Sequence, residues 1–230
     1  MSRLEGFSDA VFAFAITLLV VSLEVPKTYD ELMAAIRAFP AFAVCFALLF
    51  QVWWRHYRFF RLYDLEDAYV ITLTGLLLFV VLFYVYPLKF VWTLAFSALV
   101  GRQAGDAIRA DQAAVLFYIY GIGVVAVFAI LALLHLHAYR QRDALGLTPE
   151  ETLALRVRIY SNVGVASVGV LSIVVAAVCA RFAPRVVGLA GYTYTVIGFV
   201  EWGVGDFHGR ERRKLAASTL PASTADISRA

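Results

Sequence analysis

Long apolar runs separated by short polar stretches constrain this chain more than any other feature. An α-helix rises 1.5 Å per residue, so about 20 apolar residues cross the hydrocarbon of a bilayer. Runs near that length recur along the whole sequence, at residues 7–24, 33–54, 68–99, 112–137, 154–180 and 185–206. Hydrophobic residues make up 62% of the chain and charged residues 16%, so lipid must solvate most of its surface. The sequence predicts an all-α polytopic membrane protein with six transmembrane helices.

The six runs lie in one predicted domain, residues 1–214, followed by a small and polar tail, residues 215–230, which we expect to be disordered. The third run is the longest and contains Pro87 and Lys89. The part after Pro87 is too short to cross the bilayer again, so we expect one long helix kinked at Pro87 or an interfacial segment after it. Because Glu5 and Asp9 precede the first run, it reads as a retained helix rather than a signal peptide.

The basic residues predict the orientation of the helices. Of the 20 Lys and Arg residues, 13 fall on the side that holds the N-terminus and 7 on the other. Cytoplasmic loops carry the excess of positive charge, so both termini should be cytoplasmic, in the cell membrane. An even number of spans satisfies this requirement, in agreement with the six apolar runs.

Other classes of protein are disfavoured by composition. The net charge of +3 is small and its basic residues form no face, so nucleic acid is not an expected partner. The two cysteines, Cys45 and Cys179, lie in apolar runs and form no disulfide framework or zinc site. His135 and His137 are two residues apart and point to different helix faces, which disfavours a shared metal or haem. No cofactor and no enzymatic chemistry are predicted.

The start of the first run carries its most informative polar residues. An ionisable residue where a helix enters the membrane is costly and usually has a partner. Arg3 precedes Asp9 by six residues, so the two can meet if the chain turns. Alternatively, Ser8 or Asp9 caps the helix and complements its positive end. Both interpretations remain open on local physics alone.

Phe7, Val11, Phe14, Leu18 and Val21 follow the spacing of one helix face. Thr17 lies on nearly the same face. On spacing alone, the favoured interpretation is a stripe that faces lipid or packs against another helix.

Arg-x-x-x-Phe-Ser-Asp at the head of the first run, here Arg3, Phe7, Ser8 and Asp9, resembles the signature of the transmembrane protein 175 family of potassium channels. The residues that follow, Ala-Val-Phe-Ala-Phe-Ala-Ile-Thr-Leu-Leu-Val, are similar to the first helix of that family. The aromatic and basic end of the second run, from Trp53 to His56, is similar to the end of its second helix. The motif resemblance covers about forty residues, and the length and the six runs match one full bacterial repeat unit.

The resemblance implies a homotetramer that conducts potassium ions through a central pore, modestly selective over sodium. It implies pore rings from the first helix at Phe14, Thr17, Leu18 and Val21, with hydrophobic constriction as the gate. Arg3, Phe7, Ser8, Asp9, Trp53 and His56 are implied to be structural, tying the first helix to its neighbours. The family usually has Ile or Leu at the position of Phe14, so four aromatic rings are expected at this level here.

Two rival functions remain. A small secondary transporter would show duplicated halves with matching broken spans, and no convincing internal repeat is present. A membrane enzyme or redox protein needs clustered titratable residues at helix depth, and none has workable spacing. Three arginines at the end of the second run have the every-third spacing of a voltage sensor: Arg55, Arg58 and Arg61. We interpret them as ordinary cytoplasmic charges. Glu201, in the sixth run, is expected to be interfacial or interhelical.

Overall fold

The computed structural model describes residues 3–21, 26–99, 110–183 and 187–219. Every regular element in these residues is helical and none is a strand. The elements are α1 (Arg3–Val21), α2 (Tyr29–Tyr63), α3 (Ala68–Leu99), α4 (Ala110–Arg140), α5 (Pro149–Phe182), α6 (Leu189–Tyr192), the short 3-10 helix η3 (Thr193–Thr195) and α7 (Val196–Thr219). The predicted all-α class is confirmed.

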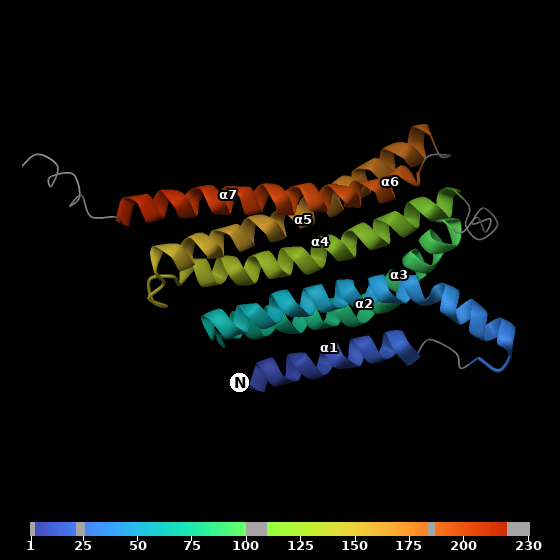
Figure 1. The fold of residues 1–230 in the computed structure, drawn as a ribbon, viewed down its shortest axis with the longest axis horizontal. Coiled ribbons are helices and arrows are strands. Elements are labelled where there is room, and N and C mark those ends of the chain that lie inside the picture. Colours follow the sequence, from blue (N-terminus) through green and yellow to red (C-terminus); the bar gives the residue numbers. More distant parts are fainter. Residues whose placement is uncertain (1–2, 22–25, 100–109, 184–186, 220–230) are drawn as a thin grey trace, which may run out of the picture.

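The long helices lie side by side along one axis, and the order across the bundle is close to the order in sequence (Figure 1). α1 packs against α2 and α3, α4 lies between α3 and α5, and α7 packs against α5. α1 therefore forms one flank of the bundle and α7 the opposite flank (Figure 1). As a consequence, one face of α1 has no neighbour among the described residues of the subunit.

Local sequence signals explain where the helices start and stop. The Thr28 hydroxyl accepts a hydrogen bond from the Glu31 N–H and caps α2, which ends at Asp64 in the left-handed region with φ 46°. At α5, Thr148 and Glu151 form a reciprocal capping box with a proline at the first turn. Caps of this kind satisfy the N–H groups that the first turn of a helix leaves unpaired.

Four of the described helical segments are long and apolar enough to cross a membrane: Tyr29–Tyr63, Ala68–Phe96, Gln112–Arg140 and Pro149–Phe182. The first and the sixth predicted spans are also helical, but they differ in form from the other four. α1 has 19 residues and includes Glu5 and Asp9. The sixth span, predicted as one helix over 185–206, consists of α6, η3 and the first half of α7. The count of six membrane spans therefore stays a prediction.

Proline bends two helices without ending them. α3 is continuous from Ala68 to Leu99 with Pro87 inside it, so the long-helix alternative of the sequence analysis is the one observed. Figure 1 shows that α2, which contains Pro40, and α3 both bend near the right-hand end of the bundle, α2 downward and α3 upward. A proline removes one backbone hydrogen bond and its ring crowds the preceding turn, which accounts for such bends. α7 extends to Thr219, past the predicted start of the tail, while residues 220–230 lie outside the described residues.

A tyrosine enters the backbone hydrogen bonding of α4. The Tyr84 hydroxyl of α3 donates to the Ile119 carbonyl and accepts from the Gly123 N–H at 3.2 Å. These two backbone groups are four residues apart, so the hydroxyl inserts between partners that an uninterrupted helix would join directly. A Cβ on Gly123 would lie 1.9 Å from the Tyr84 ring, so only glycine leaves room for this contact.

We predict that Gly123→Ala destabilises the α3–α4 packing by about 1–3 kcal/mol, because the added methyl group must displace the Tyr84 ring. The measurement is thermal or denaturant unfolding of the purified protein in detergent. Gly203→Ala in α7 is the matched control, since a Cβ there meets nothing within 4 Å. Equal stability of the two variants would contradict the assigned contact.

Candidate functional site

α1 has one face that packs inside the subunit. Its buried residues recur every three or four positions: Glu5, Ser8, Phe12, Ala15 and Leu19. Phe12, Ala15 and Leu19 belong to the main hydrophobic core shared with α2 and α3. Burial of three apolar side chains at helical spacing fixes which side of α1 turns toward the bundle.

The opposite face of α1 is open. Phe14 is 56% exposed, and Phe7 and Thr17 are also exposed. Leu18, in contrast, is only partly exposed and packs against the core. The side chain of Val21 lies outside the described residues. The structure thus brings Phe14 and Thr17 onto the open face and places Leu18 at its edge, so that the face centres on Thr17.

Asp9 anchors α1 to α2. The Trp53 indole N–H donates a hydrogen bond of 2.8 Å to Asp9 Oδ1. A charge-assisted hydrogen bond to a carboxylate is about twice as strong as a neutral one. Because Asp9 adjoins the buried Ser8 on the helix surface, this bond and the buried apolar face together set the rotation of α1 about its axis.

Two expectations for this segment are corrected. α1 begins at Arg3, so Ser8 and Asp9 lie inside the helix and neither caps it. Ser8 is buried and its hydroxyl donates to the Leu4 carbonyl of the preceding turn at 2.8 Å. Arg3 is exposed and forms no ion pair with Asp9, which instead accepts the hydrogen bond from Trp53. Arg3 and Asp9 are six residues apart, which on a continuous helix does not bring their side chains together.

His56 supports the packed face of α1 from the side of α2. It is buried, and its ring lies 5.8 Å from that of Phe12 and 4.9 Å from that of Phe60, measured between centroids. Its Nε2 has no hydrogen-bond partner among the described residues. The predicted proximity of Trp53 and His56 to the first helix is therefore observed, with one making a polar contact and the other an aromatic contact.

The Thr17 hydroxyl is oriented by its own helix. It donates to the Ala13 carbonyl at 2.8 Å. A hydroxyl has one hydrogen to donate and lone pairs that accept. Since the hydrogen is engaged with the backbone, the oxygen presents its lone pairs to the open face.

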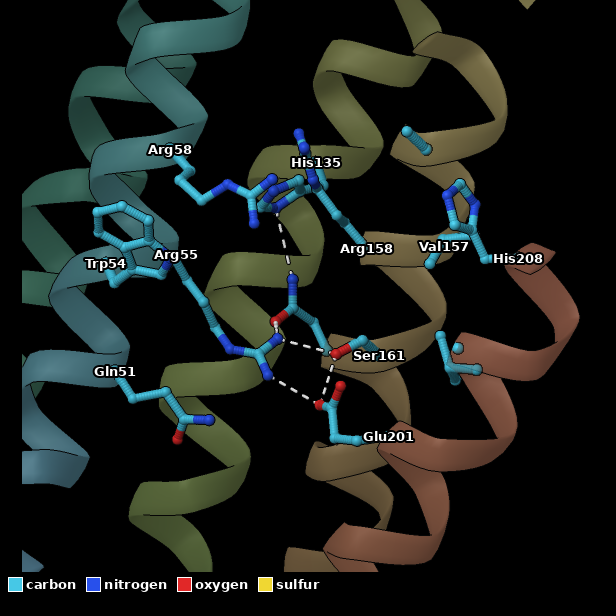
Figure 2. Close-up of a pocket in the computed structure, with 14 residues that line it drawn as sticks. Gln51, Trp54, Arg55, Arg58, His135, Val157, Arg158, Ser161, Glu201 and His208 are labelled. Atoms are coloured by element: carbon cyan, nitrogen blue, oxygen red, sulfur yellow. Dashed lines mark hydrogen bonds and ion pairs between the residues drawn. The ribbon is translucent and has the colours of Figure 1, made fainter. Parts of the chain in front are cut away.

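A second polar cluster joins α2 to α5 and α7, and Figure 2 shows its geometry. Arg55 Nη1 donates to Ser161 Oγ and to Asn162 Oδ1, each at 2.9 Å, while Arg55 Nη2 contacts Glu201 Oε1 at 2.8 Å. Ser161 completes the cluster with a 2.7 Å hydrogen bond to the same oxygen of Glu201. Of the two roles expected for Glu201, interfacial or interhelical, the structure shows the interhelical contacts.

Sequence reasoning missed the role of Arg55, which was assigned to ordinary cytoplasmic charge. The signal was present in the sequence: Ser161, Asn162 and Glu201 interrupt two apolar runs, and polar residues at such depth need partners. Their pairing across three helices was not visible from the sequence. Among the described residues, no group of three or more His, Cys, Asp or Glu side chains is placed to hold a metal ion.

We predict that Asp9→Ala lowers the free energy of unfolding by about 1–3 kcal/mol, because it leaves the Trp53 N–H without its acceptor. Asp9→Asn keeps an oxygen acceptor and should cost less. A double-mutant cycle with Trp53→Phe, measured by unfolding in detergent, isolates the pair. A coupling energy near zero would show that the two side chains act independently.

Comparison of the sequence with known families places this site in context. The sequence profile of the family described as endosomal/lysosomal potassium channel TMEM175 matches residues 3–84, which include α1 and α2. A protein of Marivirga tractuosa named as a potassium channel is 36% identical over 201 residues, covering 84% of this chain and 81% of that protein. A potassium channel of Chamaesiphon minutus is 37% identical over 93 residues, covering 37% of this chain and 46% of that protein.

Solved structures agree with the sequence matches. The fold is similar to a crystal structure of a variant of the potassium channel MtTMEM175 bound to a nanobody–MBP fusion protein, with a TM-score of 0.79 and 32% identity over 91% of this chain and 94% of that one. It also resembles a lysosomal potassium-selective channel TMEM175 homolog from Chamaesiphon minutus, at a TM-score of 0.55 and 24% identity over 88% and 96% of the two chains, which bears on the fold alone. This chain is a bacterial member of the TMEM175 potassium channel family.

Proposed function

We propose that this protein is one subunit of a homotetrameric potassium channel, with α1 from each subunit lining a central pore. Conduction is passive and down the gradient. The observation that carries the proposal is the open face of α1, which holds Phe14 and Thr17 while the opposite face is buried. Membership of a potassium channel family supports an ionic role for that face.

In this proposal the subunit crosses the membrane six times. α1 and the α6–η3–α7 segment are the two spans beyond the four that qualify by length and composition. α1 is a short helix, and its charged residues lie in its first half. We place this half at the membrane surface. The distribution of Lys and Arg supports cytoplasmic termini in the cell membrane.

The Phe14 ring supplies the hydrophobic constriction. Copies of an exposed phenylalanine around an axis form an apolar narrowing, and such narrowings close by losing their water. When the rings rotate, their faces are also available to a cation, an attraction of about 0.5–2 kcal/mol each. Leu18 and Val21 are proposed to line the next level of the same path.

Thr17 is proposed to contribute to ion preference. Because its hydroxyl hydrogen is engaged with Ala13, each subunit offers an oxygen with free lone pairs. A ring of such oxygens replaces part of the hydration shell of potassium, which is bound less tightly than that of sodium. With so few ligands, potassium selectivity over sodium should be modest.

The direct test is flux from proteoliposomes loaded with potassium. A channel passes potassium down its gradient with no coupling ion, and the flux rises with the gradient without saturating at low concentration. A small secondary transporter, the remaining alternative, requires a coupled ion and saturates. Absence of flux under both conditions would contradict both functions.

Phe14→Ala should raise single-channel conductance, because it removes the widest side chain of the proposed constriction. Phe199→Ala in α7 is the matched control, since Phe199 is also exposed but lies on the opposite flank of the bundle (Figure 1). Currents in planar bilayers measure both. An equal change in the two variants would refute the placement of Phe14 in the pore.

Thr17→Val should shift the bi-ionic reversal potential for potassium against sodium toward zero, because valine has the same shape without the oxygen. Thr72→Val is the control: Thr72 is exposed on α3 and donates to the carbonyl four residues back at 2.7 Å, as Thr17 does. An unchanged reversal potential in Thr17→Val would remove Thr17 from the account of selectivity.

A further inference from the structure

A cavity of about 390 Å³, lined by both apolar and charged residues, lies on the side of the subunit away from α1. Figure 2 shows that its walls come from α2, α4, α5 and α7. The lining segment of α5 lies within the first turns of that helix, and that of α2 near its last turns. Arg58 lies five residues before the last residue of α2 and Arg158 nine residues after the first residue of α5, so the arginines line the part of the cavity toward the end of the bundle where these two helices end and begin. Its volume is within the range of small-ligand sites.

The charges that line this cavity are unbalanced. Three arginines, Arg55, Arg58 and Arg158, face it, and Glu201 is the one carboxylate among the described lining residues. Arg55 is already occupied, because Glu201, Ser161 and Asn162 take up its donors. Glu201 is therefore committed to Arg55 and leaves the positive charges of the other two arginines without compensation.

Arg58 and Arg158 have no carboxylate partner among the described residues. Arg58 lies close enough to Arg55 and Arg158 for their charges to repel one another. Arg158 donates one hydrogen bond, at 2.9 Å, to the neutral Tyr63 hydroxyl. Figure 2 shows both guanidinium groups directed into the same upper part of the cavity, beside His135.

Acidic groups on neighbouring segments of the chain are engaged elsewhere. Asp67 pairs with His137 at 2.5 Å, and Glu150 pairs with Arg212 at 2.8 Å. The carboxylate of Glu151 closes the capping box at Thr148. None of them is free to neutralise the cavity within the part of the chain that the structure describes.

Arg58 is exposed and Arg158 is partly buried, and two like charges held side by side repel each other, which an anion bound between them relieves. The guanidinium group presents several N–H donors in a planar fork that matches the oxygens of phosphate. We propose that this cavity binds a phosphate group, held by Arg58 and Arg158. The group comes from the head group of an anionic phospholipid or from free phosphate, and its recognition by the two forks is the same in both cases.

The test is a titration of the purified full-length protein in uncharged detergent, followed by calorimetry. The probes are inorganic phosphate and a short-chain phosphatidic acid, with chloride at equal ionic strength as the reference. The double variant that combines Arg58→Gln with Arg158→Gln should bind both probes about tenfold or more weakly, because charge-assisted hydrogen bonds to the phosphate are lost. Binding of both probes assigns the site to phosphate in general, and binding of the lipid alone assigns it to a head group.

Arg61→Gln is the matched control, since Arg61 is, like Arg58, an exposed arginine of α2 but does not line the cavity. It should bind both probes as the unmodified protein does. Tyr63→Phe removes the partner of Arg158 but keeps both guanidinium groups, and it should also retain binding. If the double variant does not fold, Arg58→Gln alone carries the test, because Arg58 donates no hydrogen bond within the described residues.

Three results would overturn the proposal. The first is that neither probe releases or absorbs binding heat above the chloride reference. The second is that a folded arginine variant binds as tightly as the unmodified protein. The third is that Arg61→Gln weakens binding as much as Arg58→Gln, which would indicate general attraction to a positive surface.

Discussion

The hydrogen bond between Asp9 and the Trp53 indole, together with the buried apolar face of α1, sets which side of α1 remains open. A helix packed by apolar contacts alone can rotate and repack, whereas a charge-assisted hydrogen bond to a neighbouring helix adds a fixed geometry. With this bond in place, Phe12, Ala15 and Leu19 enter the core and Phe14 and Thr17 face away from the subunit. The proposed pore depends on this rotation, because Phe14 and Thr17 could not line a path between subunits if they were packed in the core of their own subunit.

The sequence predicted well the features that depend on periodicity and composition. The helical runs follow from bilayer thickness and backbone hydrogen bonding, and the helix that continues through Pro87 is one of the two alternatives that the short run after Pro87 left open. Phe14 and Thr17 were placed correctly on one face because their spacing requires it. Leu18 was placed on the same face by spacing alone, yet it packs against the core, since the width of an open face depends on how closely the neighbouring helices approach.

The features that the sequence could not predict are contacts between distant segments. Arg55 resembles any basic residue at a helix end, and only the fold brings Ser161, Asn162 and Glu201 around it. Gly123 resembles any glycine in a membrane helix until the Tyr84 ring is found packed on its backbone. Likewise, Arg3 and Asp9 looked like a pair because a continuous helix from Arg3 onward was not expected.

The central claim is that the open face of α1 meets water at the centre of an assembly. Its most direct test is modification of Thr17→Cys by a charged, water-soluble methanethiosulfonate reagent, in a background with Cys45→Ala and Cys179→Ala, while potassium current is recorded. The account predicts that the reagent blocks the current through Thr17→Cys and leaves Ala15→Cys, on the buried face, unaffected. A current through Thr17→Cys that is insensitive to this reagent, with the cysteine reacting only with a lipid-soluble one, would contradict the account and place the face of α1 against the bilayer.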